Sequence, residues 1–275
     1  MYRVLPLQDL DLPDLAPYRT MRFQHEQRKQ GIFVAEGEKV VRRLLESHLE
    51  VVSLLLPEKW AGQYCHLLDR RPETFVVYTA EKRLLETLTG YSMYQGVLAV
   101  ARIPPSISLE QAIQLSPAPR LFLAADNLAS AENLGGLIRN CVAFGAHALI
   151  VGETTCSPFL RRSVRSSMGA IFKLPIVEPP SLVAALHSAR ARGCRSVAAH
   201  PHAEQKWLPQ INFAGDTIIV LGSEGAGLTP EVLAACDEAA AIPIKNDVDS
   251  LNVGDAGAVF LYEACRQRSN HSHAA

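Results

Sequence analysis

Five short apolar runs in the second half of the chain constrain its fold more than any other feature. Segments of helical or loop character separate these runs, which are "RLFLAAD" (120–126), "HALIVG" (147–152), "SVAAH" (196–200), "DTIIVLG" (216–222) and "AAAIPI" (239–244). Continuous apolar runs that alternate with helices are typical of strands buried on both faces of a parallel sheet. We therefore expect an α/β domain with a mostly parallel sheet and helices on both faces.

The first half of the chain shows a similar alternation on a smaller scale. Helix-period segments at 38–47 and 81–88 alternate with apolar runs at 51–56, 74–80 and 96–103, which predicts a small α/β domain. The proline-rich stretch "IPPSISLEQAIQLSPAPR" that follows has the composition of a semi-rigid linker. The expected domains are 1–102, a linker at 103–119, a second domain at 120–268 and a mobile tail at 269–275. The first dozen residues carry little pattern and are also expected to be mobile.

Composition indicates the class of protein and its compartment but does not indicate its function. With 275 residues, 48% of them hydrophobic, the chain can bury sizeable cores. Its net charge of −1 gives no overall attraction to nucleic acid, so any RNA contact must come from local basic patches. The six cysteines form no C-x-x-C pair, so we expect reduced, buried thiols and no metal site. Short apolar runs and an acidic N-terminal stretch predict a cytoplasmic protein without a membrane span.

The segment "NLGGLIRNCVAFGA" (133–146) has the apolar period of a helix, with Asn133 placed to cap its start and Gly145 to end it. Arg139 lies off the apolar stripe, where most arginines are simply solvated. The pair Gly135 and Gly136 points to close backbone approach in the first turn, because glycine costs about 1 kcal/mol relative to alanine there. We therefore expect something to pack or bind tightly against this turn.

The segment "IIVLGSEGAGL" (218–228) runs from a strand into a glycine-rich loop. Its order, G-x-x-G-x-G, is not the dinucleotide-binding fingerprint, and a plain strand-to-helix turn is equally compatible with it. Glu224 stands between glycines at the carboxyl end of an apolar strand, which is where an open α/β sheet usually places its site. Glu224 is therefore a candidate site residue.

The segment "VDSLNVGDAGAVFLYEAC" (248–265) predicts a helix buried nearly all round. Asn252 suits its N-cap, Asp255 three residues on imitates a capping box, and Ser250 suits a turn. The stretch "PFLRRSVRSSMGAIFKLP" (158–175) gathers arginines and hydroxyls, which bind phosphate oxygens well. A charged surface helix explains the second stretch equally well.

Taken in register, these segments resemble the SpoU (TrmH-like) family of RNA 2′-O-ribose methyltransferases. The residues that match its motifs are Asn133, Gly135, Arg139, Gly145, Arg165, Ser167, Gly169, Ala170, Gly222, Glu224, Gly225, Gly227, Leu228, Ile242, Pro243, Ser250, Leu251 and Asn252. The first half matches more loosely, through Phe33, Glu36 and Gly37 and through "YQGVLAV" (94–100). The resemblance implies a small RNA-binding α/β domain followed by a SPOUT-like domain with a C-terminal trefoil knot, whereas the sequence pattern alone predicts an unknotted sheet.

The resemblance also implies S-adenosylmethionine as cofactor, rRNA or tRNA as substrate, a ribose 2′-hydroxyl as methyl acceptor, and a homodimer. The implied catalytic residues are Asn133, Arg139, Glu224, Ser250 and Asn252. The implied cofactor-binding residues are Gly222, Gly227, Ile242 and Leu251, and the implied RNA-binding residues are Arg165 and Ser167. A guanidinium has a very high pKa and rarely gives up its proton, so Arg139 is expected to position a phosphate and polarise the hydroxyl. The residue that acts as the general base is not assigned.

The chain departs from the family pattern at Ser223, Asn246 and Gly254-Asp255. Ser and Asn suit turn positions, so cofactor binding is expected to survive, while Asp255 has no assigned role. Two alternative functions remain at this stage. One is a non-catalytic RNA-binding relative that keeps the domain as a scaffold, and the other is a methyltransferase that acts on a base or a protein.

Overall fold

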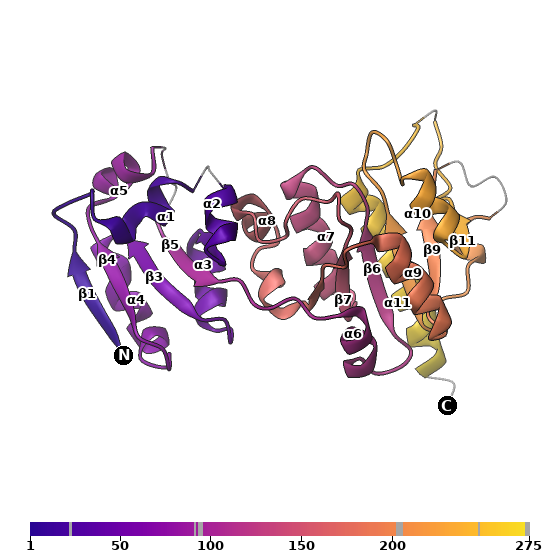
Figure 1. The fold of residues 1–275 in the computed structure, drawn as a ribbon, viewed down its shortest axis with the longest axis horizontal. Coiled ribbons are helices and arrows are strands. Elements are labelled where there is room, and N and C mark those ends of the chain that lie inside the picture. Colours follow the sequence, from indigo (N-terminus) through magenta and orange to yellow (C-terminus); the bar gives the residue numbers. More distant parts are fainter. Residues whose placement is uncertain (22–23, 91, 93–95, 202–205, 247, 273–275) are drawn as a thin grey trace. The chain divides into compact units, whose positions relative to one another are not determined.

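The computed structural model describes residues 1–21, 24–90, 92, 96–201, 206–246 and 248–272 (Figure 1). The chain divides into two compact units. Met1–Pro105 and Phe159–Lys173 form the first, and Ser106–Pro158 and Leu174–Ala275 form the second. Residues 159–173 therefore pack with the first unit, although the sequence pattern placed them in the domain at 120–268.

The first unit is built on a five-stranded mixed sheet with the order β1-β4-β3-β5-β2, in which β1, β4 and β3 are parallel and β5 is antiparallel to β3 and β2. The strands are β1 Tyr2–Pro6, β2 Ile32–Glu36, β3 Val51–Leu56, β4 Phe75–Thr79 and β5 Leu98–Arg102. The helices are η1 Pro13–Leu15, α1 Ala16–Arg19, α2 Gln24–Lys29, α3 Glu38–Leu45, α4 Glu58–Leu68, α5 Lys82–Thr89, α8 Arg161–Ser166 and η2 Ala170–Lys173. Because β1 pairs with β4, the expectation of a mobile N-terminus was wrong for residues 2–6. In "YQGVLAV", Tyr94 and Gln95 lie outside the described residues.

Helix α8 joins the first unit through a carboxylate on strand β2. Glu36, at the end of β2, pairs with Arg161 and, at 3.1 Å, with Arg165. The ring of Phe33 packs at 5.3 Å from that of Phe159 and at 5.8 Å from that of Phe172. The arginine-rich segment is thus held on the edge strand of the first sheet.

The second unit is built on a six-stranded sheet in which every strand pair is parallel, with the order β11-β9-β10-β6-β7-β8. The strands are β6 Leu121–Ala125, β7 Ala148–Val151, β8 Ile176–Val177, β9 Arg195–Ala199, β10 Thr217–Leu221 and β11 Glu238–Ala240. The helices are α6 Leu109–Leu115, α7 Ala131–Ala143, α9 Leu182–Ala191, η3 Leu208–Gln210, α10 Pro230–Ala235 and α11 Val253–Ser272. The predicted parallel sheet is confirmed. The two-residue strand β8 was not predicted, because so short a run leaves no period to read.

Helices cover both faces of this sheet. Alternate residues of the central strands, such as Phe122 and Ile218, pack into one core with α6, α9 and α10. On the other face, α11 packs against α7 and β10. Helix α11 continues to Ser272, so residues 269–272 of the predicted mobile tail are helical, and 273–275 lie outside the described residues.

Helix α11 packs tightly against α7 at a glycine. A Cβ added to Gly257 would overlap the Cδ2 methyl of Leu137 and lie 3.1 Å from Cδ1 of Leu221. Leu137 is fully buried and Leu221 is 2% exposed, so neither has room to move aside. Gly136, on α7, has nothing within 4 Å of the corresponding position.

All six cysteines are free thiols. Burial raises the pKa of the Cys141 and Cys194 thiols to about 12, so neither is a reactive thiolate. Cys65 is exposed, which differs from the expectation of buried cysteines. Within the described ranges, no helix is both long enough and apolar enough to cross a bilayer.

These contacts predict opposite effects for two glycine-to-alanine changes. Gly257→Ala is expected to destabilise the protein by about 1–3 kcal/mol, because the added methyl overpacks the α7–α11 contact. Gly136→Ala is expected to be neutral or to stabilise by up to about 1 kcal/mol, because alanine favours the helix and meets no neighbour. Urea unfolding followed by circular dichroism measures both. Equal stability of the two variants would contradict the packing argument.

Candidate functional site

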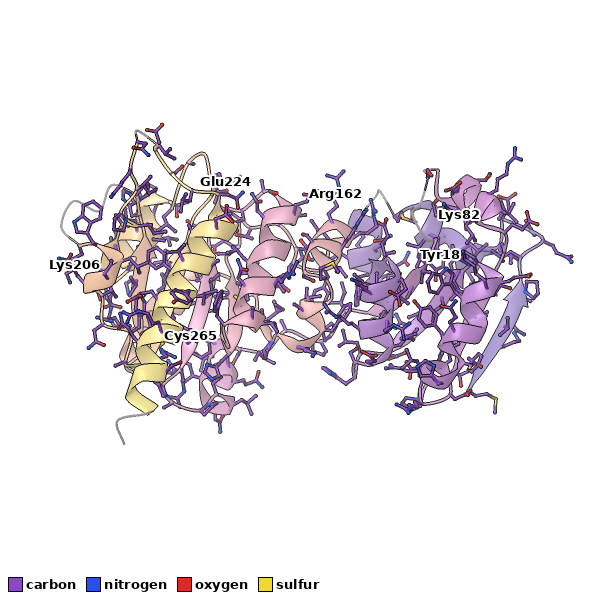
Figure 2. All side chains as sticks on the ribbon, turned by 180° about the vertical axis from the view of Figure 1, so that it is seen from behind. Tyr18, Lys82, Arg162, Lys206, Glu224 and Cys265 are labelled. Atoms are coloured by element: carbon purple, nitrogen blue, oxygen red, sulfur yellow. The ribbon has the colours of Figure 1, made fainter. Side chains whose placement is uncertain are left out.

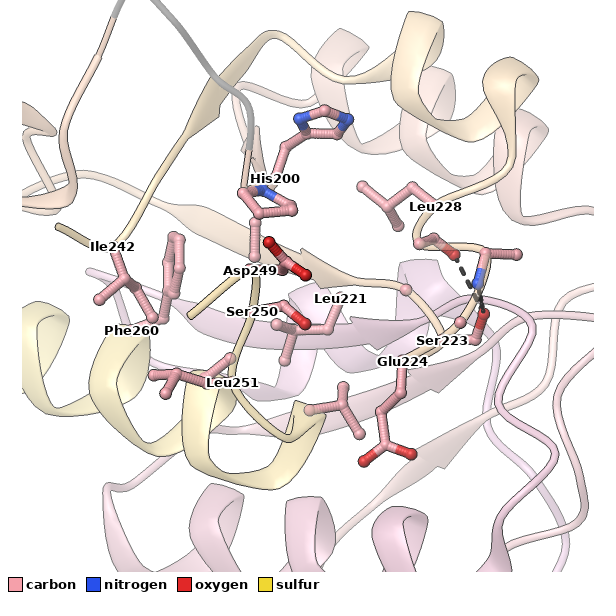
Figure 3. Close-up of a pocket in the computed structure, with 18 of the residues that line it drawn as sticks. His200, Leu221, Ser223, Glu224, Leu228, Ile242, Asp249, Ser250, Leu251 and Phe260 are labelled. Atoms are coloured by element: carbon pink, nitrogen blue, oxygen red, sulfur yellow. Dashed lines mark hydrogen bonds between the residues drawn. The ribbon is translucent and has the colours of Figure 1, made fainter. Parts of the chain in front are cut away.

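A pocket of the second unit lies at the carboxyl ends of β9, β10 and β11, beside the loop that leads into α11 (Figure 3). Its volume is about 450 Å³, within the range of small-molecule sites. Parallel α/β sheets generally place their ligands at this edge. Six of the implied catalytic and cofactor-binding residues line the pocket: Gly222, Glu224, Gly227, Ile242, Ser250 and Leu251.

A tight turn after β10 forms one wall of the pocket. The backbone N–H of Ser223 donates to the carbonyl of Gly227 at 3.0 Å, and the N–H of Gly227 donates back to Ser223 at 2.9 Å. Gly227 has a φ of 69°, which favours glycine, and a Cβ at Gly222 would overlap the backbone of Gly227 and Leu228. The glycines are therefore required by the shape of this wall.

A buried carboxylate that the sequence analysis did not select fixes the same turn from behind. Asp126, at the end of β6, is 3% exposed and accepts hydrogen bonds from the backbone N–H (2.7 Å) and hydroxyl (2.9 Å) of Thr229. Thr229 is the N-cap of α10. An acid that ends the apolar run "RLFLAAD" is the signal that could have identified it.

The structure brings Asn133, Glu224 and Asn252 together. The side-chain amide of Asn252 donates to Glu224 and, at 3.3 Å, to Oδ1 of Asn133. Its own Oδ1 accepts from the N–H of Gly254 at 2.8 Å, so Asn252 caps α11 as predicted. These bonds connect the turn after β10, helix α7 and the start of α11. We call these three side chains the amide–carboxylate cluster.

The predicted capping role of Asn133 was wrong. Helix α7 begins at Ala131, and the side chain of Ser130 caps it by accepting the backbone N–H of Asn133 at 3.2 Å. The cap therefore lies three residues earlier than the apolar period suggested. The amide of Asn133 is consequently available to Asn252.

Arg139 lies on the exposed part of α7 and is not in the pocket lining. Among the described residues it has no hydrogen-bond or ion-pair partner. The neighbouring Asn140 donates to the carbonyl of Gly254 at 2.8 Å, which fixes this turn of α7 against the start of α11. Arg139 thus extends from a helix that is held in place, with its guanidinium free for a ligand.

The two predicted RNA-binding residues lie in the first unit, with α8. Arg165 is 61% exposed in its side chain while it pairs with Glu36, and Arg162 of the same helix is also exposed (Figure 2). Ser167 is fully buried: its hydroxyl donates to the carbonyl of Val164 at 2.8 Å and accepts from the N–H of Gly169 at 3.2 Å. This hydroxyl holds a turn and does not face solvent, so the structure does not support its predicted contact with RNA.

Two further polar residues line the pocket, His200 after β9 and Asp249 in the loop before α11. His200 ends an apolar strand run, and Asp249 directly precedes the "SLN" segment. These positions at the carboxyl edge of the sheet were signals that could have identified both residues. In the same loop, Asn246 has a φ of 63°, a left-handed conformation that asparagine tolerates well. This explains how asparagine fits where the family pattern has glycine.

Comparison with known proteins shows the family to which the chain belongs. The SpoU rRNA Methylase family model matches residues 120–262, which contain the pocket and the amide–carboxylate cluster. The chain belongs to the SpoU rRNA methylase family. The 23S rRNA (guanosine-2′-O-)-methyltransferase RlmB of Acinetobacter baylyi is 32% identical over 70% of this chain and 79% of its own.

Solved structures of SpoU-type proteins show the same fold along nearly the whole chain. The AdoMet-bound rRNA methyltransferase from Sinorhizobium meliloti has a TM-score of 0.82 at 25% identity and covers 96% of this chain and 98% of its own. The SpoU methyltransferase AviRb from Streptomyces viridochromogenes, in complex with AdoMet, has a TM-score of 0.78 at 28% identity, with coverage of 93% and 99%. The protein is therefore an RNA methyltransferase that uses S-adenosylmethionine.

The pocket suits this cofactor chemically. Leu221, Leu228 and Phe260 offer apolar surface, while the glycine turn leaves backbone groups open to a ligand. The cofactor, when bound, supplies a methyl group on a positively charged sulfur. The chain's part is to hold it with the methyl accessible and to present the acceptor.

The glycine turn provides a test of the pocket. Gly222→Ala is expected to abolish measurable S-adenosylmethionine binding and to destabilise the protein by roughly 3 kcal/mol, because the methyl group has only backbone to displace. Gly225→Ala, in the same turn, is the matched control, because its added Cβ has nothing within 4 Å and its φ is not positive. Isothermal titration calorimetry measures binding. Wild-type affinity in the Gly222 variant would remove the turn from the site.

Proposed function

We propose that the protein transfers the methyl group of S-adenosylmethionine to a ribose 2′-hydroxyl in structured rRNA or tRNA. The observation that carries this proposal is the amide–carboxylate cluster, which joins the pocket wall at Glu224 to helix α7 at Asn133, the helix that bears Arg139. Supporting it is the similarity to the guanosine-2′-O-methyltransferase of Acinetobacter baylyi. Supporting it as well are Ser250 and Leu251, which belong to the "SLN" segment and line the pocket.

The reaction forms a carbon–oxygen bond to the ribose while the carbon–sulfur bond breaks, and its electron pair stays on sulfur. The hydroxyl proton must leave to a base or to water. The protein accelerates such a step mainly by positioning the two reactants in line, because proximity lowers the activation free energy by several kcal/mol. The hydrogen bonds of Asn252 to Glu224 and Asn133 hold the three walls of the site at fixed spacing.

Arg139 is proposed to bind an RNA phosphate next to the reacting ribose and to polarise its hydroxyl. A guanidinium presents several N–H donors in a fixed plane, which suits phosphate oxygens. Its exposure on α7, without a partner in the described part of the chain, leaves those donors available. Arg165, which pairs with Glu36, is proposed to bind another RNA phosphate from the first unit.

We further propose that the C-terminal segment is threaded as a trefoil knot, as the family resemblance implies. Strand β11 lies at the sheet edge next to β9, whereas α11 packs on β10 and α7. The chain after Ala240 therefore passes back across the carboxyl ends of β9 and β10. This path is the one that a threaded chain would take.

The proposed compartment is the cytoplasm, where rRNA and tRNA are modified.

The assay that tests the function combines the purified protein with S-adenosylmethionine labelled in the methyl group and with rRNA or tRNA that lacks the modification. We expect label in a 2′-O-methylated nucleoside after complete digestion, measured by liquid chromatography with mass spectrometry. Label in a methylated base, or no transfer to any cellular RNA despite cofactor binding, would contradict the proposal.

Arg139→Ala is the decisive variant in this assay. We expect at least a hundredfold loss of transfer with nearly unchanged cofactor affinity, because Arg139 does not line the pocket. Arg192→Ala removes an arginine that pairs with Glu110, beside α9 on the opposite face of the sheet, and is expected to keep full activity. Equal activity of both variants would remove Arg139 from the mechanism.

A homodimer is proposed on the basis of the exposed side of α11. Val259 and Tyr262 are 37% and 57% exposed, and the Tyr262 ring lies 6.3 Å from that of Phe144 on the same surface. Contiguous exposed apolar groups commonly mark a protein interface. Sedimentation velocity is expected to show a dimer that Tyr262→Asp converts to monomer, while Leu115→Asp, at an exposed position of α6, leaves it intact. A monomeric wild-type protein would contradict this.

A further inference from the structure

Among lysine, arginine and carboxylate side chains, the described part of the pocket lining holds those of one sign only. The described lining residues include two carboxylates, Glu224 and Asp249, and neither a lysine nor an arginine. Sites that bind an anionic ligand group usually supply such a cation. The pocket therefore favours a ligand with excess positive charge.

The two carboxylates differ in their hydrogen bonding. Glu224 accepts a hydrogen bond from the amide of Asn252 and belongs to the amide–carboxylate cluster. Asp249 is exposed and has no hydrogen-bond or ion-pair partner among the described residues. It stands in the loop between the Ile242 strand end and the "SLN" segment, between His200 and Ser250 in the view of Figure 3.

The cofactor and its product differ mainly in charge. S-adenosylmethionine carries a sulfonium, an ammonium and a carboxylate, for a net charge of +1. After transfer, S-adenosylhomocysteine keeps the ammonium and the carboxylate but has a neutral thioether. A carboxylate near the sulfur therefore stabilises the cofactor and not the product.

We propose that Asp249 is the specificity-determining residue by which this pocket distinguishes the cationic cofactor from its neutral product. The inference rests on the assignment of this pocket to the cofactor. Asp249 attracts the sulfonium and loses that attraction when the methyl group leaves. Product release is thereby favoured without movement of the pocket walls.

The size of the pocket sets the size of the effect. A pocket of about 450 Å³ is roughly 10 Å across, so a sulfur atom inside it lies within about 5–10 Å of a lining carboxylate. At an effective dielectric constant between that of a protein surface and that of water, one charge at this distance changes affinity by roughly three- to tenfold. Solvent exposure of Asp249 keeps the effect at this modest level.

The test compares ligand affinities without RNA, by isothermal titration calorimetry on the full-length protein. Asp249→Asn keeps the size of the side chain and removes its charge. We expect it to weaken S-adenosylmethionine binding roughly three- to tenfold and to leave S-adenosylhomocysteine binding within twofold. Sinefungin, which carries an ammonium in place of the sulfonium, is expected to weaken as the cofactor does. The difference between variant and wild type should shrink at high salt.

Glu231→Gln is the matched control. It removes one exposed negative charge of the same unit, at α10 and outside the pocket lining, and should leave all three affinities unchanged. Equal weakening of all three ligands by Asp249→Asn, or no change in any of them, would overturn the inference. The proposed methyl transfer survives either result, because it is measured on RNA with the wild-type protein. Failure of the wild-type protein to bind any of the ligands would overturn both.

Discussion

One side chain, Asn252, holds together three segments that are far apart in the sequence. Its Oδ1 caps α11, and its amide group reaches the turn after β10 and helix α7. An asparagine is suited to this task because its amide both accepts and donates hydrogen bonds in one plane. Neither aspartate, which lacks the donor, nor serine, which is too short, would serve all three partners. The amide–carboxylate cluster depends on this residue, which connects the pocket wall to the helix that bears Arg139.

The sheet beneath supplies the rigidity that such a polar cluster requires. Its central strands are buried on both faces, and their carboxyl ends lie at one edge of the sheet. Asp126, His200 and Gly222 follow three neighbouring strands, so they lie at the same edge although they are far apart in the sequence. Close packing at Gly257 then brings α11 against α7. Apolar packing therefore sets the distances, and the hydrogen bonds select the geometry within them.

Much of this arrangement could be predicted from residues whose physical requirement is local. Apolar runs predicted the parallel strands, the end of a strand made Glu224 a candidate, and the cap pattern predicted the place of Asn252, whereas the site roles of Gly222 and Asn252 came from the family resemblance. The misses have two causes: the cap of α7 and the Ser167 turn rest on hydrogen bonds between residues two or three apart that the apolar period does not show, whereas β1 depends on a distant strand. Ser130 replaced Asn133 as the cap of α7, Ser167 is buried in a turn, and β1 is ordered only because β4 accepts it. Asp126 and Asp249 carry no periodic signal at all.

The placement of residues 159–173 bears on how the protein is made. The chain passes between the two units three times, after Pro105, after Pro158 and after Lys173. The edge strand β2 therefore waits for Arg161 and Arg165 until the ribosome has already produced β6 and β7 of the other unit. The first unit is thus complete only when Lys173 has been made, after part of the second unit, and neither unit corresponds to a fragment that a single cut in the chain would release.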